Sequence, residues 1–161
     1  MNPVAQSPLF VRAGAGHFAD LGDHRAHIRV SADHTEGVFM LVEIDADFNA
    51  GVPPHVHRIE DETFVVLSGQ IEFGIGEQTV EAGPGDTVFA PRNIAHTWRC
   101  TSAEGAKVLI WFTPGDNFQS FGLAMAAQGV VPQEAMADPV LAAKFMALTA
   151  KHGIEMLLPG K

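Results

Sequence analysis

Between His24 and Phe112 the sequence is a succession of short apolar stretches, and this pattern limits the chain to a mainly β fold. The stretches have period-two or continuous apolar character, which is typical of β-strands. Turn-forming residues separate them: Asn49-Ala50-Gly51, Ser68-Gly69, Gly76, Gly83-Pro84-Gly85 and Pro91-Arg92-Asn93. Short strands with Gly and Pro corners predict an all-β antiparallel sandwich or barrel.

After Pro114 the sequence changes to an Ala-, Met- and Leu-rich texture. The stretch 117–129 closes on a glycine, as a short helix does. Asp138-Pro139 then supplies an N-cap residue followed by proline at the first helical position, and Lys151-His152-Gly153 marks the end of that helix. We therefore expect one or two C-terminal helices, which either pack on the outside of the barrel or form a lid over its mouth.

The chain has the length of one domain, with 161 residues and an apolar fraction of 47%. We expect a single domain over residues 1–161, with a β-barrel at about 24–113 and a helical extension at 114–161. No window holds the roughly 18 uninterrupted apolar residues of a membrane-spanning helix, and the N-terminus lacks the pattern of a secretory signal. These features, together with the single cysteine Cys100, predict a cytoplasmic protein that does not bind a membrane.

The charge balance argues against nucleic acid as a partner. The formal net charge is −9, and the ten basic residues are scattered along the chain. Phosphate backbones demand clustered Lys and Arg instead. The eight histidines are more informative, because histidine is the commonest metal ligand in proteins.

Two of these histidines, His55 and His57, stand two residues apart. On a strand this spacing places both side chains on one face, where two imidazoles can reach one metal ion. Glu62 follows at an odd spacing, so it joins them only if the chain turns at Arg58–Asp61. This charged stretch suits a turn, and Glu60 or Asp61 could replace Glu62 if the turn is shorter.

His96 begins a new strand after a proline-containing corner. With His55, His57 and Glu62 it forms a mixed nitrogen and oxygen donor set. Such a set suits one divalent transition metal ion (Fe, Mn, Ni, Cu, Co or Zn) and disfavours Ca²⁺ and Mg²⁺. Four protein ligands leave two positions of an octahedral ion open, which favours a catalytic site over a structural one.

These residues give the sequence a close resemblance to the cupin family. Its first motif, G-x5-H-x-H-x3–4-E-x6-G, is matched by His55, His57, Glu62 and Gly69, although Asn49 holds the place of the leading glycine. The second motif, G-x5-P-x-G-x2-H-x3-N, is matched by Gly85, Pro91 and His96, with Asn93 and Cys100 replacing its inner glycine and final asparagine. The resemblance implies a double-stranded β-helix, a jelly-roll-like barrel that holds a metal through His55, His57, Glu62 and His96.

Two aromatic side chains are candidates for lining a substrate pocket. Phe64 shares the strand face of Glu62, and Trp98 shares the face of His96. The alternative is simple core packing, because side chains fill the interiors of barrels. Cys100 is expected to be a buried, inert thiol. The remaining histidines match no ligand spacing and are expected on the surface or in loops: His17, His24, His27, His34 and His152.

The resemblance is strongest to the single-barrel, quercetin dioxygenase-like cupins, which implies a dioxygenase-like enzyme acting on a small organic substrate. Glu62 would act as base if it leaves the metal. One alternative is a metal-dependent isomerase or epimerase, although sugar phosphates would require several Lys or Arg in the pocket. The other is a non-enzymatic barrel that binds or senses a small molecule. A homodimer is implied by the resemblance, since an exposed edge strand could pair with its copy.

Overall fold

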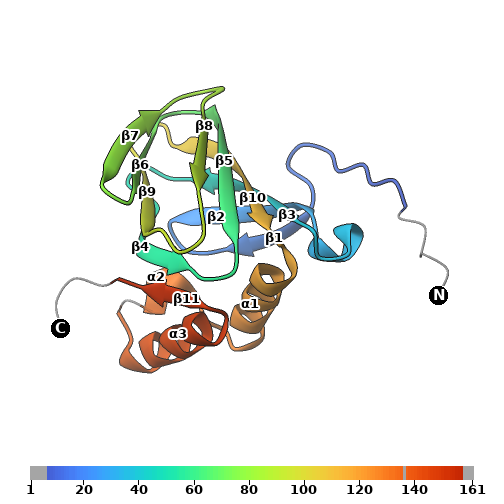
Figure 1. Cartoon of the computed structure of the whole chain (residues 1–161), viewed down its shortest axis with the longest axis vertical. Coiled ribbons are helices and arrows are strands. Elements are labelled where there is room, and N and C mark those ends of the chain that lie inside the picture. The colour runs from blue at the N-terminus through green and yellow to red at the C-terminus, as the bar shows by residue number, and fades with distance from the viewer. Residues whose placement is uncertain (1–6, 136, 158–161) are drawn as a thin grey trace.

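A computed structural model describes residues 7–135 and 137–157 of the chain. Two antiparallel β-sheets face each other, and helices follow them at the C-terminal end (Figure 1). The all-β prediction with C-terminal helices is therefore confirmed. The elements are β1 His17–Asp20, β2 His24–Val30, η1 Ala32–Thr35, β3 Met40–Ala46, β4 Gly51–His57, β5 Asp61–Ser68, β6 Ile71–Ile75, β7 Gln78–Ala82, β8 Thr87–Ala90, β9 His96–Cys100, β10 Ala106–Thr113, α1 Asp116–Ala127, α2 Pro132–Ala135, α3 Pro139–Lys151 and β11 Ile154–Met156.

The strand order interleaves distant parts of the sequence. One sheet has the order β1-β2-β3-β10-β5-β8, and the other has the order β11-β4-β9-β6-β7. Consecutive strands β4 and β5 thus lie in different sheets, joined by the short connection Arg58–Glu60. The turn expected at this point is present, and it takes the chain from one sheet to the other.

The core fills the space between the two sheets because the inward faces of the strands are apolar. Burial alternates along β3, where Met40, Val42, Ile44 and Ala46 are buried, and β10 follows the same period. This period of two is what a strand with one buried face produces. The central layer contains Phe64, Phe73 and Ile71, each at most 1% exposed.

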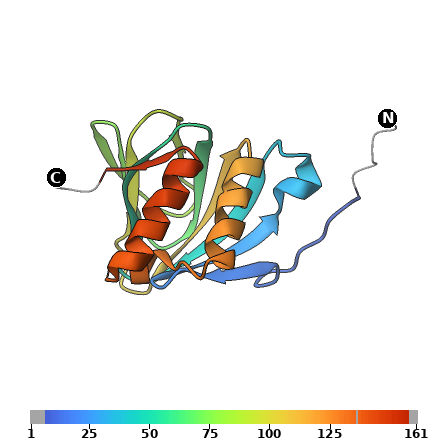
Figure 2. The same ribbon diagram turned by 90° about the horizontal axis from the view of Figure 1, so that it is seen from below.

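The C-terminal helices form a second, smaller core of their own. Both longer helices were predicted, and the Asp138 side chain caps α3 by accepting from the backbone N–H of Val140 and Leu141. Figure 2 shows α1 and α3 side by side against one side of the β structure. We call α1, α2 and α3 the helical layer. Phe118 of α1 packs against both cores. No helix within residues 7–135 and 137–157 is long and apolar enough to cross a membrane.

Some local expectations were wrong. His24 was expected on the surface or in a loop, but it lies in β2 and is 7% exposed; His152 lies in the turn after α3, as a loop position was expected, but is equally buried. The His24 ring packs edge-on against Trp98, and the His152 ring lies 5.7 Å from that of Phe121. Gly51 was expected in a turn but begins β4, where an added Cβ would lie 2.2 Å from the carbonyl oxygen of Trp98. The buried position expected for Cys100 is confirmed.

Candidate metal centre

Four side chains from three strands meet in the interior. His55 and His57 come from β4, Glu62 from β5 and His96 from β9. Each offers one nitrogen or oxygen atom, and these four atoms all lie within 4.8 Å of one another. None of the four residues is more than 5% exposed. The structure thus brings together the whole set of residues that the sequence singled out as metal ligands.

The fold explains how residues with this spacing converge. His55 and His57 lie on one face of β4, and His55 is directly opposite His96 in the β4–β9 pair. Glu62 approaches from the facing sheet, because the connection Arg58–Glu60 carries the chain across the barrel. His57 and Glu62 therefore do not belong to one continuous strand, and their odd spacing does not prevent their side chains from meeting.

Each imidazole is held through Nδ1. His55 Nδ1 lies 2.8 Å from the carbonyl oxygen of Pro53, and His96 Nδ1 lies 3.1 Å from that of Ile94. His57 Nδ1 lies 2.8 Å from Glu60 Oε2. All three acceptors require an Nδ1–H donor, so in the neutral imidazoles Nε2 carries the lone pair that can bind a metal.

The Nε2 atoms of His57 and His96 face Glu62. His57 Nε2 is 3.0 Å from Glu62 Oε1, and His96 Nε2 is 3.3 Å from Glu62 Oε2. His96 Nε2 is buried but makes no hydrogen bond. A buried polar atom without a partner costs free energy unless something else occupies that partner's place, and a bound cation would do so.

The buried cluster shifts the pKa values of its members. Burial lowers the pKa of His55 to about 4, with the neighbouring imidazoles acting in the same direction. Burial also acts to lower the pKa of His57, but its contacts with Glu60 and Glu62 outweigh this effect and raise the pKa to about 9. Burial of Glu62 is likewise outweighed by contacts with His57 and His96, which hold its pKa well below the ordinary range.

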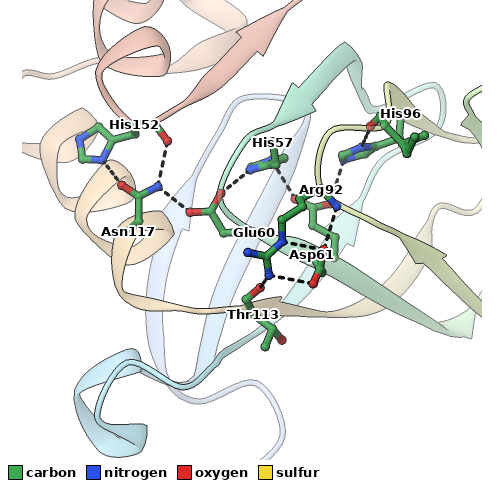
Figure 3. Close-up of polar contacts among 10 residues, drawn as sticks. His57, Glu60, Asp61, Arg92, His96, Thr113, Asn117 and His152 are labelled. Carbon is green, nitrogen blue, oxygen red and sulfur yellow. Dashed lines mark hydrogen bonds and ion pairs between the residues drawn. The ribbon is translucent and has the colours of Figure 1, made fainter.

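The neighbouring carboxylates that could have replaced Glu62 are engaged elsewhere. Asp61 forms an ion pair with Arg92 at 2.9 Å, and this contact lowers the pKa of Asp61 (Figure 3). Glu60 lies on the Nδ1 side of His57, away from the other imidazoles, and also accepts from Asn117 Nδ2 at 2.5 Å. Neither belongs to the group of four converging donors.

The two residues proposed for a pocket lie in the main core. Phe64 is 1% exposed and packs against Phe73, with a ring-centroid distance of 5.0 Å, and Trp98 is 4% exposed. Their role in lining a substrate pocket stays a prediction. The aromatic rings beside the site are others: Phe118 lies 5.7 Å and Phe112 lies 6.3 Å from the His57 ring. Sequence reasoning missed Phe118 because only the packing of the helical layer brings it to the barrel.

Three nitrogen donors and one carboxylate oxygen fit a divalent transition metal, and the cluster is consistent with such an ion. A two-sheet antiparallel barrel with this donor set inside defines a cupin-type protein. The family model described as "Cupin domain" matches residues 42–112, which include all four residues. This chain belongs to the cupin superfamily.

Two curated proteins illustrate the relationship. This chain is 28% identical to quercetin 2,3-dioxygenase of Bacillus subtilis over 100 residues, which are 62% of this chain and 30% of that protein. It is 30% identical to an uncharacterized protein of Streptomyces coelicolor over 77 residues, which are 48% of this chain and 70% of that protein. The matched segment thus spans less than a third of the dioxygenase.

Solved structures support the fold. KdgF from Halomonas sp. has a TM-score of 0.60 and 21% identity, over 67% of this chain and 94% of that one. An RmlC-like cupin from Shewanella frigidimarina has a TM-score of 0.58 and 22% identity, over 68% of this chain and 93% of that one. At such low identity these likenesses concern the architecture alone.

Proposed function

We propose that this chain binds one divalent transition metal ion through His55, His57, Glu62 and His96, and uses it as a dioxygenase-like enzyme on a small organic substrate. The observation that carries the metal site is the arrangement of Nδ1 partners. All three imidazoles are held so that Nε2 remains available, and these atoms converge with a carboxylate in a buried place.

A bound ion would act as a Lewis acid on an enolate or carboxylate oxygen of the substrate, and a redox-active ion would also bring O₂ close to it. The four residues are buried, and the apolar rings of Phe112 and Phe118 lie beside His57. Glu62 is the candidate base. Glu62 would help to hold the ion, so it could accept a proton only after it leaves the metal.

The choice of dioxygenase chemistry rests on the relative named quercetin 2,3-dioxygenase. An isomerase acting on sugar phosphates is less well supported, because such substrates need free cationic side chains at the site. Arg58, Arg92 and Arg99 are the arginines on the elements next to the four residues, and each pairs with a carboxylate: Glu155, Asp61 and Glu72. A homodimer stays a prediction.

Elemental analysis of protein purified without chelators tests this proposal. We expect close to one transition metal ion per chain, and a sharp loss of metal in His57→Ala and His96→Ala. His17→Ala is the matched control, because His17 is an exposed histidine on the edge strand β1 and should retain the full content. Full metal occupancy in the double variant His55→Ala, His57→Ala would overturn the proposed site.

The reaction is tested by oxygen uptake with flavonols, catechols and β-diketones, using protein loaded separately with iron, nickel and copper. Consumption that disappears in His96→Ala would support the dioxygenase. Uptake with none of these substrates, in protein shown to hold metal, would contradict it and favour a sensing or isomerising cupin.

A further inference from the structure

A chain of buried and partly buried hydrogen bonds connects the helical layer to the candidate metal centre. His57 Nδ1 donates to Glu60 Oε2 at 2.8 Å. The other carboxylate oxygen of Glu60 accepts from Asn117 Nδ2, and the same amide nitrogen donates to the carbonyl oxygen of His152 at 2.8 Å. Figure 3 shows the sequence of contacts from His152 through Asn117 and Glu60 to His57.

The contacts of Asn117 determine the orientation of its amide. The two acceptors around Nδ2 are a carboxylate oxygen and a backbone carbonyl, and neither can donate. Oδ1 lies 3.1 Å from His152 Nδ1, which can donate. Exchanging the nitrogen and oxygen would set oxygen against oxygen twice, so Asn117 has one favourable arrangement. It therefore presents a fixed N–H to Glu60.

Glu60 is fully buried, with an exposed fraction of 0%. Burying a carboxylate costs free energy unless hydrogen bonds satisfy both of its oxygens. Here one hydrogen bond comes from His57 and the other from Asn117. The bond to His57 fixes the rotation of that ring and places the proton on Nδ1. Carboxylates that hold a ligand histidine in this way orient it and raise its basicity.

We propose that Glu60 is a positioning residue for His57, and that Asn117 positions Glu60, so that the helical layer is part of the metal site. The inference rests on the proposed function, because it assigns roles to residues around the same ion. It goes further by making α1 and the residue after α3 determinants of metal affinity, although neither contributes a ligand.

The experiment compares Glu60→Ala, Glu60→Gln and Asn117→Ala with a control, Ser120→Ala. Ser120 lies one turn further along α1, is exposed, and donates to the Asp116 carbonyl of its own helix. Two properties are measured with Co²⁺: the affinity, by competition with a chromophoric chelator, and the visible absorption spectrum of the bound ion. Urea unfolding of chelator-treated protein records the purely structural cost of each substitution.

We expect Glu60→Ala to weaken Co²⁺ binding by about 10- to 100-fold, the usual effect of losing such a partner, and to change the spectrum. Glu60→Gln keeps an oxygen that can accept from His57 Nδ1, so it should recover part of the affinity. Asn117→Ala should weaken binding in the same direction by a smaller factor, and Ser120→Ala should match the wild type. If Glu60→Ala fails to fold, Glu60→Gln and Asn117→Ala decide the matter.

Two negative results are distinguishable. If the wild-type protein binds no Co²⁺, the proposed function fails and this inference fails with it. If the wild type binds Co²⁺ and the Glu60 and Asn117 variants bind it with unchanged affinity and spectrum, the inference is overturned while the metal site stands. A change in urea stability without a change in affinity or spectrum would likewise assign Glu60 and Asn117 a structural role alone.

Discussion

The three imidazoles of the site are held in two different ways. His55 and His96 donate from Nδ1 to backbone carbonyls, whereas His57 donates to the carboxylate of Glu60. A hydrogen bond to a carboxylate is stronger than one to a carbonyl. It stabilises the protonated form of the imidazole and so raises the pKa of the ring. This difference agrees with the raised pKa of His57 and the lowered pKa of His55. The site is therefore not symmetric among its histidines.

At the residue scale, a single substitution tests whether Phe64 serves the core or a pocket. Because Phe64 is 1% exposed and packs on Phe73, we expect Phe64→Ala to lower the free energy of unfolding by about 3–5 kcal/mol. Urea denaturation of chelator-treated protein measures this loss. The control is Phe89→Ala, since Phe89 is 55% exposed and its removal should cost less than about 0.5 kcal/mol. A loss below 1 kcal/mol in Phe64→Ala, with substrate binding abolished, would instead favour pocket lining.

Residue chemistry also explains two departures from the cupin motifs. Asn49 and Asn93 stand where the motifs have glycine, and their φ angles are +65° and +66°. Asparagine is the side chain that best tolerates this left-handed region, so both turns keep their shape.

The four candidate ligands could be predicted from their spacing in the sequence, whereas the proposed role of Glu60 could not. Its partner Asn117 lies 57 positions further along the chain, and no local pattern connects them.

At the scale of elements, α1 is a helix that contacts the candidate metal centre. The Phe118 ring stacks on that of Phe112 with a centroid distance of 3.6 Å and an interplanar angle of 9°. It also lies 5.7 Å from His57. The C-terminal helices were expected either to pack on the outside of the barrel or to form a lid over its mouth. The contact between Phe118 and His57 places α1 beside the candidate metal centre. Its movement as a lid stays a prediction.

This packing predicts that α1 slows the escape of a bound ion. We expect Phe118→Ala to increase severalfold the rate at which a chelator removes metal, because water gains access to one side of the His57 ring. Stopped-flow mixing of metal-loaded protein with excess chelator measures the rate. Leu123→Ala is a suitable control, since Leu123 is a 58% exposed residue of the same helix. Equal rates in the wild type and Phe118→Ala would show that α1 does not restrict access.

Element prediction succeeded where local signals are strong. The long strands of the barrel have clear alternation and turn residues at their ends, and α3 has an Asp-Pro start. It failed for β11, which has three residues and exists because it pairs with β4, and for α2, which has a single turn. β1, His17–Asp20, lies before the β region that was expected to begin at His24. Pairing with a distant partner, rather than local propensity, defines the shortest elements.

At the scale of the whole molecule, two sheets must close around the site before four ligands can meet. β10 lies between β3 and β5, so the order of strands in space differs from their order in sequence. Periodicity predicts that strands exist, but it does not determine which strands become neighbours. The cupin resemblance supplied that information.

Because the site forms only in the folded protein, metal binding should stabilise the whole chain. A ligand that binds the native state alone, at 100 times its Kd, adds about 2.7 kcal/mol to the free energy of unfolding. At 100 times its Kd, we expect Co²⁺ to raise the free energy of unfolding of chelator-treated wild type by this amount in urea denaturation. The double variant His55→Ala, His57→Ala should show no such increase. An equal gain in both proteins would mean that the ion binds elsewhere.

The pairing of β11 with β4 has a consequence in time. β4 carries His55 and His57, and its outer neighbour is β11, with Ile154 opposite His57 and Met156 opposite His55. During synthesis at about 5–20 residues per second, the ribosome needs on the order of 5–20 seconds to pass from one strand to the other. Throughout that interval the nascent strand that holds two of the four candidate ligands has an open edge. The barrel therefore acquires its last strand late, at the place where it would hold its metal.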